Sequence, residues 1–557
     1  MKLVNVTSEL GDLARAWRYS SEFDCWCLED VGYAAAPTDS RFQRLHIYAP
    51  GPYLAGGHVS CGAPCGAYDA ASAPVVFHNE SGGYMQMPPN YVGTPLCEAL
   101  PYLRRGMVFV SCGCRGVESK DAHVRAWCGK APTALVDLKS AIRFLRHNRA
   151  VLPGDYDRVI SVGMSSGGAL STLLGVTGDN PNYLPYLEAA GAFIDESDAV
   201  FAAQAYCPIT DLDHADMAYE WNYRADAHYE PSIANHSGEL GAFERALSER
   251  LAAGYIDYFN GLGLKEPASG TALALGADGR SGSGYDYLLE KLSEAATKYL
   301  TLLEAGALAE GYSAEEYLAG GYAMERRGYT DAHASMIRFF MGRQPRLVGH
   351  LPDITAGTML CLMPKGMRGA SEPKKNAVGS PKPWLSWDGT AARVDDLDRY
   401  VLEHRRRYKP CPAFDAVGCT TAENRLFGDA TRYAKHFCPV MPGMLEELQG
   451  RFPERCGELL RAYEGMERDE GLAHQRHLMN PFNFLGTAEQ ARSTQAQHFR
   501  VRTGAFDADS SFMVSMSLAL RLQEAGIPTS YELVWEQPHC HADYPGEVQD
   551  WIDGICL

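Results

Sequence analysis

The sequence predicts an α/β fold, with a mostly parallel sheet covered by helices and a large, mainly helical cap (lid) inserted into it. Three observations support this. Strand-like and helix-like runs alternate over the first two hundred or so residues. A serine flanked by glycines stands where a strand passes into a helix. Strand-like runs return only near the end of the chain, after a long helical stretch.

The early strands are short apolar runs rich in β-branched and aromatic residues, which is typical of strands buried on both faces. Between the expected strands at 106–112 and 158–163, Pro132 suits the first turn of a helix. One face of this helix carries Leu135, Leu138, Ile142 and Leu145. Strands separated by helices pair in parallel. The expected strands cover residues 45–50, 74–78, 106–112, 158–163 and 199–207.

The alternation stops near residue 212 and resumes near residue 480. Between these points the chain is mostly helix-like, with Gly-, Pro- and Lys-rich loops at 276–285 and 364–383. Strand signals return at 498–506 and 531–536, with a helix between them and a closing helix at the end. We therefore predict a discontinuous catalytic domain, 1–211 with 480–557, interrupted by a helical cap at 212–479.

Composition and charge limit the functions that the chain can have. The chain has 557 residues, 46% hydrophobic and 22% charged, with a formal net charge of −18. A chain this acidic repels nucleic acid and anionic membranes, so we expect neither as a partner, but a neutral or cationic small molecule. There is no signal-peptide pattern and no run of ~18 apolar residues, so we expect a cytoplasmic protein. The 16 cysteines lack zinc-site spacing and are expected to be buried free thiols. The sequence does not predict an oligomeric state.

Residues Gly163-Met164-Ser165-Ser166-Gly167 match the Gly-x-Ser-x-Gly pattern. Glycines on both sides allow a tight strand-to-helix turn that lifts the Ser165 hydroxyl clear of the sheet. The turn leaves the N–H of Ser166 at a helix N-terminus, where it can donate to an oxyanion. A plain Gly-Ser turn is the alternative, and the apolar strand before it argues against that.

A serine nucleophile needs a base, and the base needs an orienting acid. In α/β-hydrolases these follow the serine in the order acid, histidine. Asp507 and Asp509 come after the last-but-one strand, and His539 and His541 after the last. Gly504 favours Asp507, and closeness to the strand end favours His539. The carboxyl ends of these two strands are expected to lie at the same edge of the sheet as Ser165.

The second oxyanion donor is expected from an earlier strand-to-loop junction. The run PVVFHNESGGYM supplies a buried strand followed by Gly82-Gly83, whose small size lets backbone approach a substrate carbonyl. A plain glycine turn is the alternative.

Five blocks of the chain together resemble bacterial tannases, serine esterases that cleave gallate esters. They are GMSSGGALSTLLGVTGDNPNYLPYLEAAGA, HNESGGYM, AYCPITDLDHADMAYEW, RVRTGAFDADSSF and WEQPHCHADY. The resemblance implies Ser165 as nucleophile, Asp507 as acid and His539 as base. It also implies that Lys409, Glu423 and Asp509 hold the phenolic hydroxyls of the galloyl ring. A solvated basic run, a surface carboxylate and a turn residue are the respective alternatives for those three.

Two departures from related patterns stand out. The last block has an additional residue and a second histidine, PHCHADY. Fungal tannases and feruloyl esterases join cysteines beside the serine and the histidine. Here Cys540 follows His539, but Met164 precedes Ser165, so that disulfide cannot form.

The motifs predict a serine esterase that works through an acyl-enzyme, and the resemblance implies that it hydrolyses galloyl ester bonds of hydrolysable tannins and simple gallate esters. No cofactor is expected, and Asp507 with Asp509 makes too few ligands to predict a metal. The alternatives are a carboxylesterase or feruloyl esterase, a peptidase, and a catalytically silent binding protein.

Overall fold

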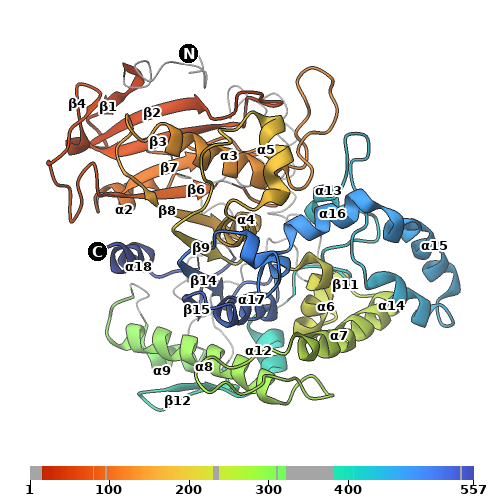
Figure 1. Cartoon of the computed structure of the whole chain (residues 1–557). Helices are drawn as coiled ribbons and strands as arrows, with labels where there is room; N and C mark the ends of the chain where they lie inside the picture. Colours follow the sequence, from red (N-terminus) through yellow and green to blue (C-terminus); the bar gives the residue numbers. More distant parts are fainter. Residues whose placement is uncertain are drawn as a thin grey trace.

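The computed structural model describes residues 15–79, 81–94, 97–229, 238–308, 312–320, 381–405, 407–539 and 542–557. Its centre is a sheet of nine described strands in the order β1-β2-β3-β7-β6-β8-β9-β14-β15 (Figure 1). These strands are β1 (Arg18–Ser20), β2 (Cys25–Gly32), β3 (Arg44–Pro50), β6 (Pro74–Asn79), β7 (Val108–Cys112), β8 (Asp155–Met164), β9 (Ala202–Tyr206), β14 (His498–Gly504) and β15 (Thr529–Val534).

The strands from β7 to β15 in this order pair in parallel, whereas β1, β2 and β3 pair antiparallel. Every residue of β6 and β7 is buried, as expected for strands covered on both faces. The predicted α/β-hydrolase fold is confirmed, and each predicted strand is present. The sequence analysis missed β1 and β2 because the acidic residues and cysteines of β2 do not form an apolar run.

Helices cover the sheet and extend beyond it. The predicted helix near Pro132 is α3, in which Leu135, Leu138, Ile142 and Leu145 are all fully buried. The helices are α2 (Ala99–Leu103), α3 (Thr133–His147), α4 (Ser166–Val176), α5 (Leu184–Ala190), α6 (Leu212–Tyr223), α7 (Ala242–Leu262), α8 (Ser283–Glu304), α9 (Ala314–Leu318), α12 (Leu397–Glu403), α13 (Ala422–Leu426), α14 (Met441–Leu448), α15 (Pro453–Tyr463), α16 (Glu470–Met479), α17 (Phe512–Glu524) and α18 (Glu547–Cys556).

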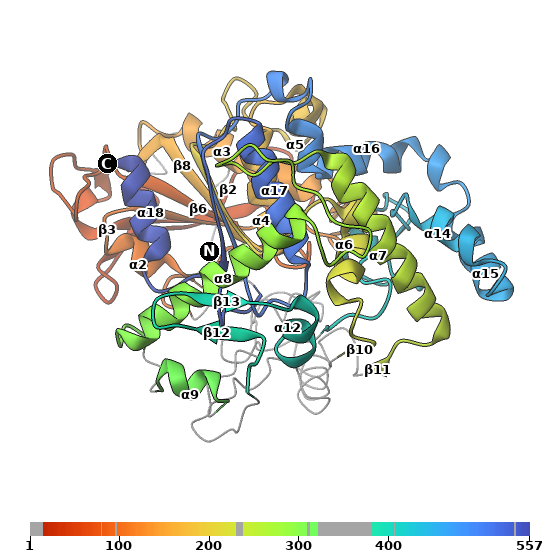
Figure 2. The same ribbon diagram turned by 90° about the horizontal axis from the view of Figure 1, so that it is seen from below.

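The inserted stretch between β9 and β14 forms two groups of elements. Helices α7, α14, α15 and α16 lie to the right of the sheet in Figure 1, whereas α8, α9 and β12 (Leu385–Trp387) lie below β15. Figure 2 shows α8 running beside α12 and β13 (Ala392–Val394). Helix α8 packs directly on β15, and α6 packs on α17. The predicted division at 212 and 479 stays a prediction, and these contacts show that parts of the insert rest on the sheet layer itself.

No disulfide joins two of the cysteines that the structure describes, and most of these cysteines are buried. No helix in the described ranges is both long and apolar enough to cross a membrane.

A buried charge cluster fixes α3 to the loop before β9. The carboxylate of Asp198 accepts hydrogen bonds from Lys139 Nζ and Arg143 Nε, each at 2.7 Å. Burial raises the pKa of Asp198, but the charges of Lys139 and Arg143 outweigh it and hold the pKa below its ordinary value. The aspartate is therefore ionised and paired.

We expect Asp198→Asn to lower the free energy of unfolding by about 3–5 kcal/mol, because it leaves two buried cations without their counter-charge. Urea denaturation measures this. Asp195→Asn is the matched control, since Asp195 is exposed and should change stability by less than about 0.5 kcal/mol. Equal stability of the two variants would contradict the prediction.

Candidate active site

Ser165 occupies a sharp turn between β8 and α4. Its φ and ψ are 60° and −123°, a conformation that a residue with a side chain adopts only under strain and that concentrates at functional sites. A Cβ on Gly163 would lie 2.2 Å from the Gly167 carbonyl oxygen, and one on Gly167 would lie 2.7 Å from the Ser81 oxygen. Only glycine fits at both positions, which is the physical reason for the Gly-x-Ser-x-Gly pattern.

A continuous hydrogen-bond relay joins the serine to a buried acid. His539 Nε2 lies 2.8 Å from Ser165 Oγ, and His539 Nδ1 lies 2.9 Å from Asp507 Oδ2. The Asp507 side chain is fully buried, whereas 20% of the His539 side chain is exposed. The predicted nucleophile, base and acid are thus brought together from three distant parts of the chain.

The Asp507 carboxylate is held in its ionised form. Oδ1 accepts a hydrogen bond from the Asp509 N–H at 2.8 Å, and Oδ2 accepts one from the Ser510 hydroxyl at 3.2 Å. Burial raises the pKa of Asp507, but the charge and hydrogen bond of His539 outweigh it and lower the pKa to about 2. Asp507 therefore carries a negative charge at neutral pH and can stabilise a protonated His539 ring.

The ends of β14 and β15 bring acid and base into register. These two strands pair in parallel, with Gly504 opposite Val534. A Cβ on Gly504 would lie 2.2 Å from the Gln537 carbonyl oxygen. The loop that carries Asp507 (residues 505–511, the acid loop) and the loop that carries His539 after β15 therefore cross at a point where only glycine fits. The glycine that favoured Asp507 in the sequence has this role. His541 and Cys540 lie outside the described residues.

The Gly82-Gly83 turn lies beside the residue that follows Ser165. Ser166 opens α4, so its N–H is one of the first four of the helix, which lack an intrahelical acceptor. The Ser166 hydroxyl accepts a hydrogen bond from the Tyr84 N–H at 2.9 Å and lies 3.3 Å from the Ser81 hydroxyl. Gly83 has φ +56°, and these contacts hold its turn against the start of α4.

The three residues matched to ring recognition come from three separate segments of the chain. The Nζ of half-buried Lys409 lies 3.9 Å from the centroid of the Phe414 ring. Asp509 follows the acid by two residues; burial raises the pKa of Tyr219, and the charge of Asp509 adds a smaller effect in the same direction. Glu423 lies on α13; burial, and then the charge of Glu423, raise the pKa of Tyr84.

Lys409 does not end a solvated basic run. Its neighbours Arg405 and Arg407 are almost fully buried. Arg405 donates hydrogen bonds to the carbonyl oxygens of Asp507 and Ser510 in the acid loop. The sequence analysis missed these arginines and Tyr219. The available signal was a dense basic run in an acidic chain, directly before Lys409.

The thiol of Cys207 adjoins the relay. Its sulfur, an Asp507 carboxylate oxygen and a His539 ring nitrogen all lie within 4.8 Å of one another. Two of these three groups already bind each other in the relay, so we assign no separate ion site to them.

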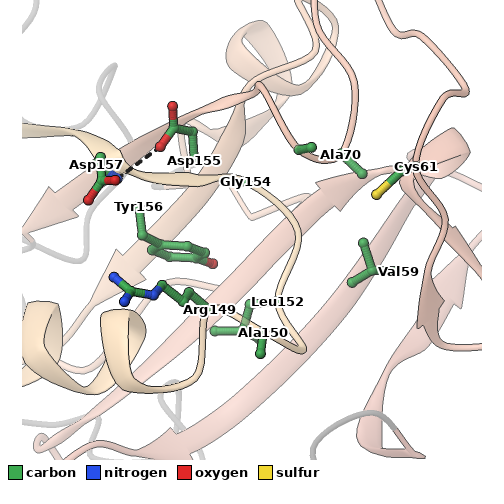
Figure 3. A pocket seen from close by; sticks show the side chains of 11 residues that line it. Val59, Cys61, Ala70, Arg149, Ala150, Leu152, Gly154, Asp155, Tyr156 and Asp157 are labelled. Carbon is green, nitrogen blue, oxygen red and sulfur yellow. Dashed lines mark hydrogen bonds between the residues drawn. The ribbon is translucent and has the colours of Figure 1, made fainter.

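Figure 3 shows a cavity of about 430 Å³, and no residue of the relay is among those that line it. Its lining includes Gly154 and Asp155 at the start of β8, and Val59 of the short β4–β5 hairpin, Leu54–Ala55 with His58–Val59. Ser165 follows the opposite end of β8, ten residues and roughly 30 Å away. Since sites in such sheets form at the carboxyl ends of the strands, this cavity is separate from the candidate active site.

Comparison with known proteins supports the same fold and class. The BD-FAE family model matches residues 119–234. A tannase from Lactobacillus plantarum is 28% identical, with a TM-score of 0.70 over 96% of this chain and 95% of that one. A Fusobacterium nucleatum tannase is 26% identical, with a TM-score of 0.69 over 96% and 95%. A tannin acyl hydrolase solved in complex with ethyl gallate is 29% identical, with a TM-score of 0.68 over 96% and 94%. No curated protein sequence matches significantly.

These likenesses span nearly the whole of each chain, cap included, and not the sheet alone. The chain is therefore an ester hydrolase of the α/β-hydrolase superfamily, and its full-length structural neighbours include bacterial tannases.

Proposed function

We propose that this esterase hydrolyses galloyl esters through a covalent acyl-enzyme formed on Ser165. The observation that supports it most directly is the unbroken relay from Ser165 Oγ through His539 to the buried Asp507 carboxylate. A serine hydroxyl is a weak nucleophile, and a base at 2.8 Å that is itself oriented by an acid activates it.

In the proposed reaction, His539 Nε2 takes the proton of Ser165 as Oγ attacks the ester carbonyl carbon. The oxyanion accepts hydrogen bonds from the N–H of Ser166 and from that of Gly82 or Gly83. The C–O bond to the alcohol breaks, and the alcohol leaves with the proton held by His539. Water, deprotonated by the same ring, then attacks the acyl carbon and releases gallic acid and Ser165. Asp507 holds the ring tautomer throughout.

The acyl specificity is proposed to come from Lys409, Glu423 and Asp509. Adjacent phenols are donors, and carboxylates accept from them, while an ammonium favours a partly ionised phenol. The chain's structural neighbours include a tannin acyl hydrolase in complex with ethyl gallate and one with 3,4-dihydroxybenzoate, both with hydroxylated rings.

We expect Glu423→Ala and Asp509→Ala each to lower kcat/KM for methyl gallate about 10- to 100-fold, the loss of a charge-assisted hydrogen bond. For methyl benzoate, which has no ring hydroxyl, the loss should stay below about threefold. Steady-state kinetics with both esters measures this. Glu454→Ala, at an exposed position on α15, is the matched control and should leave both substrates unchanged.

Two results would contradict the proposal. An equal loss on both esters would mean that these carboxylates support the structure only. Faster turnover of methyl ferulate than of methyl gallate by the wild-type protein would assign the enzyme to feruloyl esters.

A further inference from the structure

The hydroxyl of Tyr219 lies between the two segments that carry the proposed ring-binding groups. It donates a hydrogen bond to the Ala508 carbonyl oxygen at 3.0 Å, between Asp507 and Asp509. It accepts from the backbone N–H groups of Tyr408 at 3.1 Å and Lys409 at 3.2 Å. One buried oxygen atom on α6 thus connects the acid loop to the segment that carries Lys409.

The backbone of Lys409 is held at both of its polar groups. Its N–H is bound by Tyr219, and its carbonyl oxygen accepts from Arg407 Nε at 3.1 Å. Arg407 in turn pairs with Glu220 at 2.7 Å, and both side chains are fully buried. Because Tyr219 and Glu220 are consecutive on α6, this helix sets the position of the Lys409 backbone.

The acid loop has several hydrogen bonds besides the one from Tyr219. Tyr400 donates to the Ala505 carbonyl oxygen, and Arg405 donates to those of Asp507 and Ser510. Loss of the Tyr219 hydroxyl therefore removes only one of several hydrogen bonds that hold the acid loop. It removes, in contrast, the hydrogen bond that the structure describes for the Lys409 N–H. We therefore expect loss of this hydroxyl to displace Lys409 more than it displaces the relay residues.

We propose that Tyr219 is a positioning residue that sets the separation of the Lys409 ammonium and the Asp509 carboxylate, and so determines the preference for hydroxylated rings. This rests on the proposed galloyl esterase function. It makes the ring-binding site a fixed assembly built across α6, with Tyr219 acting through Lys409 and not on the substrate.

The test is Tyr219→Phe, which keeps the ring and removes the hydroxyl. KM for methyl gallate should rise about tenfold, because the variant loses the hydrogen bonds of one buried hydroxyl. The kcat for methyl benzoate should change by less than about twofold, because the relay is unaffected. Tyr223→Phe is the matched control: Tyr223 is one turn along α6, its ring centroid is 4.6 Å from that of Tyr219, and its buried hydroxyl has no hydrogen-bond partner among the described residues. It should leave both values unchanged.

A double-mutant cycle with Lys409→Met tests the route of the effect. If Tyr219 acts through Lys409, Tyr219→Phe in the Lys409→Met background should change KM for methyl gallate by less than about twofold. Full additivity of the two changes would overturn the inference, as would an unchanged KM in Tyr219→Phe alone.

Arg407→Lys covers the case in which Tyr219→Phe does not fold. It keeps a cation beside Glu220 and removes the Nε donor to the Lys409 carbonyl, so a rise in KM for methyl gallate is expected, and no rise would overturn the claim that α6 positions Lys409 through its backbone. The two proposals fail separately. A wild-type enzyme without any preference for methyl gallate over methyl benzoate refutes the galloyl function, whereas a wild-type preference that survives in Tyr219→Phe refutes only the role of Tyr219.

Discussion

Ser165→Ala should lower kcat for ester hydrolysis by roughly 10⁴- to 10⁶-fold, with little change in KM. Without Oγ no acyl-enzyme forms, and the remaining rate comes from substrate binding and oxyanion stabilisation alone. Release of acid from methyl gallate by the purified variant measures the loss, and the wild-type protein should show a burst of alcohol release when acyl-enzyme hydrolysis is slow.

Labelling provides an independent readout. A fluorophosphonate should react with the wild-type protein at Ser165 and leave Ser165→Ala unlabelled. Ser269→Ala, at an exposed position, is the control and should label and turn over normally. An active wild-type enzyme labelled at another serine would falsify the assignment of the nucleophile, and an intact serine that never reacts would favour the binding-protein alternative.

Asp507→Asn should lower kcat by about 10³- to 10⁴-fold, the largest loss we expect from a single isosteric change. The amide of asparagine can present an N–H to His539 Nδ1, which holds the ring in the tautomer that protonates Nε2, and Nε2 then cannot accept the proton of Ser165. The substitution also removes the negative charge that stabilises the protonated ring. Methyl benzoate is the substrate for this measurement, since it separates the relay from ring recognition.

Asp509→Asn is the paired variant, because Asp509 is the sequence neighbour that competes for the role of acid. The Asp509 N–H, which donates to Asp507 Oδ1, remains in this variant. On methyl benzoate its loss should be at least about 100-fold smaller than that of Asp507→Asn. Comparable losses would mean that the two aspartates share the task, and a larger loss in Asp509→Asn would reverse the assignment.

The sequence was most informative where function depends on local backbone geometry. Glycine is needed at 163 because a Cβ there would meet the Gly167 carbonyl oxygen, and this local reason let the pattern be read without coordinates, whereas the contact that requires glycine at 167 comes from Ser81. Strands β6 and β7 and the centre of β8 were predictable because strands buried on both faces are mostly apolar. The order of serine, acid and histidine, and Gly504 before the acid, were also readable along the chain.

Other features depended on contacts between residues far apart in the chain. The sequence favoured Asp507 over Asp509 only through the preceding glycine and the family resemblance, whereas the crossing of the loops after β14 and β15 aims the Asp507 carboxylate at His539. The basic run HRRRYK resembled a solvated surface, because the acceptors of Arg405 are carbonyl groups of the acid loop about one hundred residues later, and Arg407 pairs with Glu220 far earlier in the chain.

The sequence by itself thus determined the fold class, the nucleophile turn and the short set of residues from which the relay is drawn, since each is dictated by backbone sterics and apolar periodicity over a few neighbouring residues. Tertiary structure alone decided that Asp507 faces His539, that Arg405 and Arg407 are buried, and that Tyr219 joins Lys409 to the acid loop. Hydrogen bonds between distant segments leave no pattern in local composition, so they become visible only when the chain is folded.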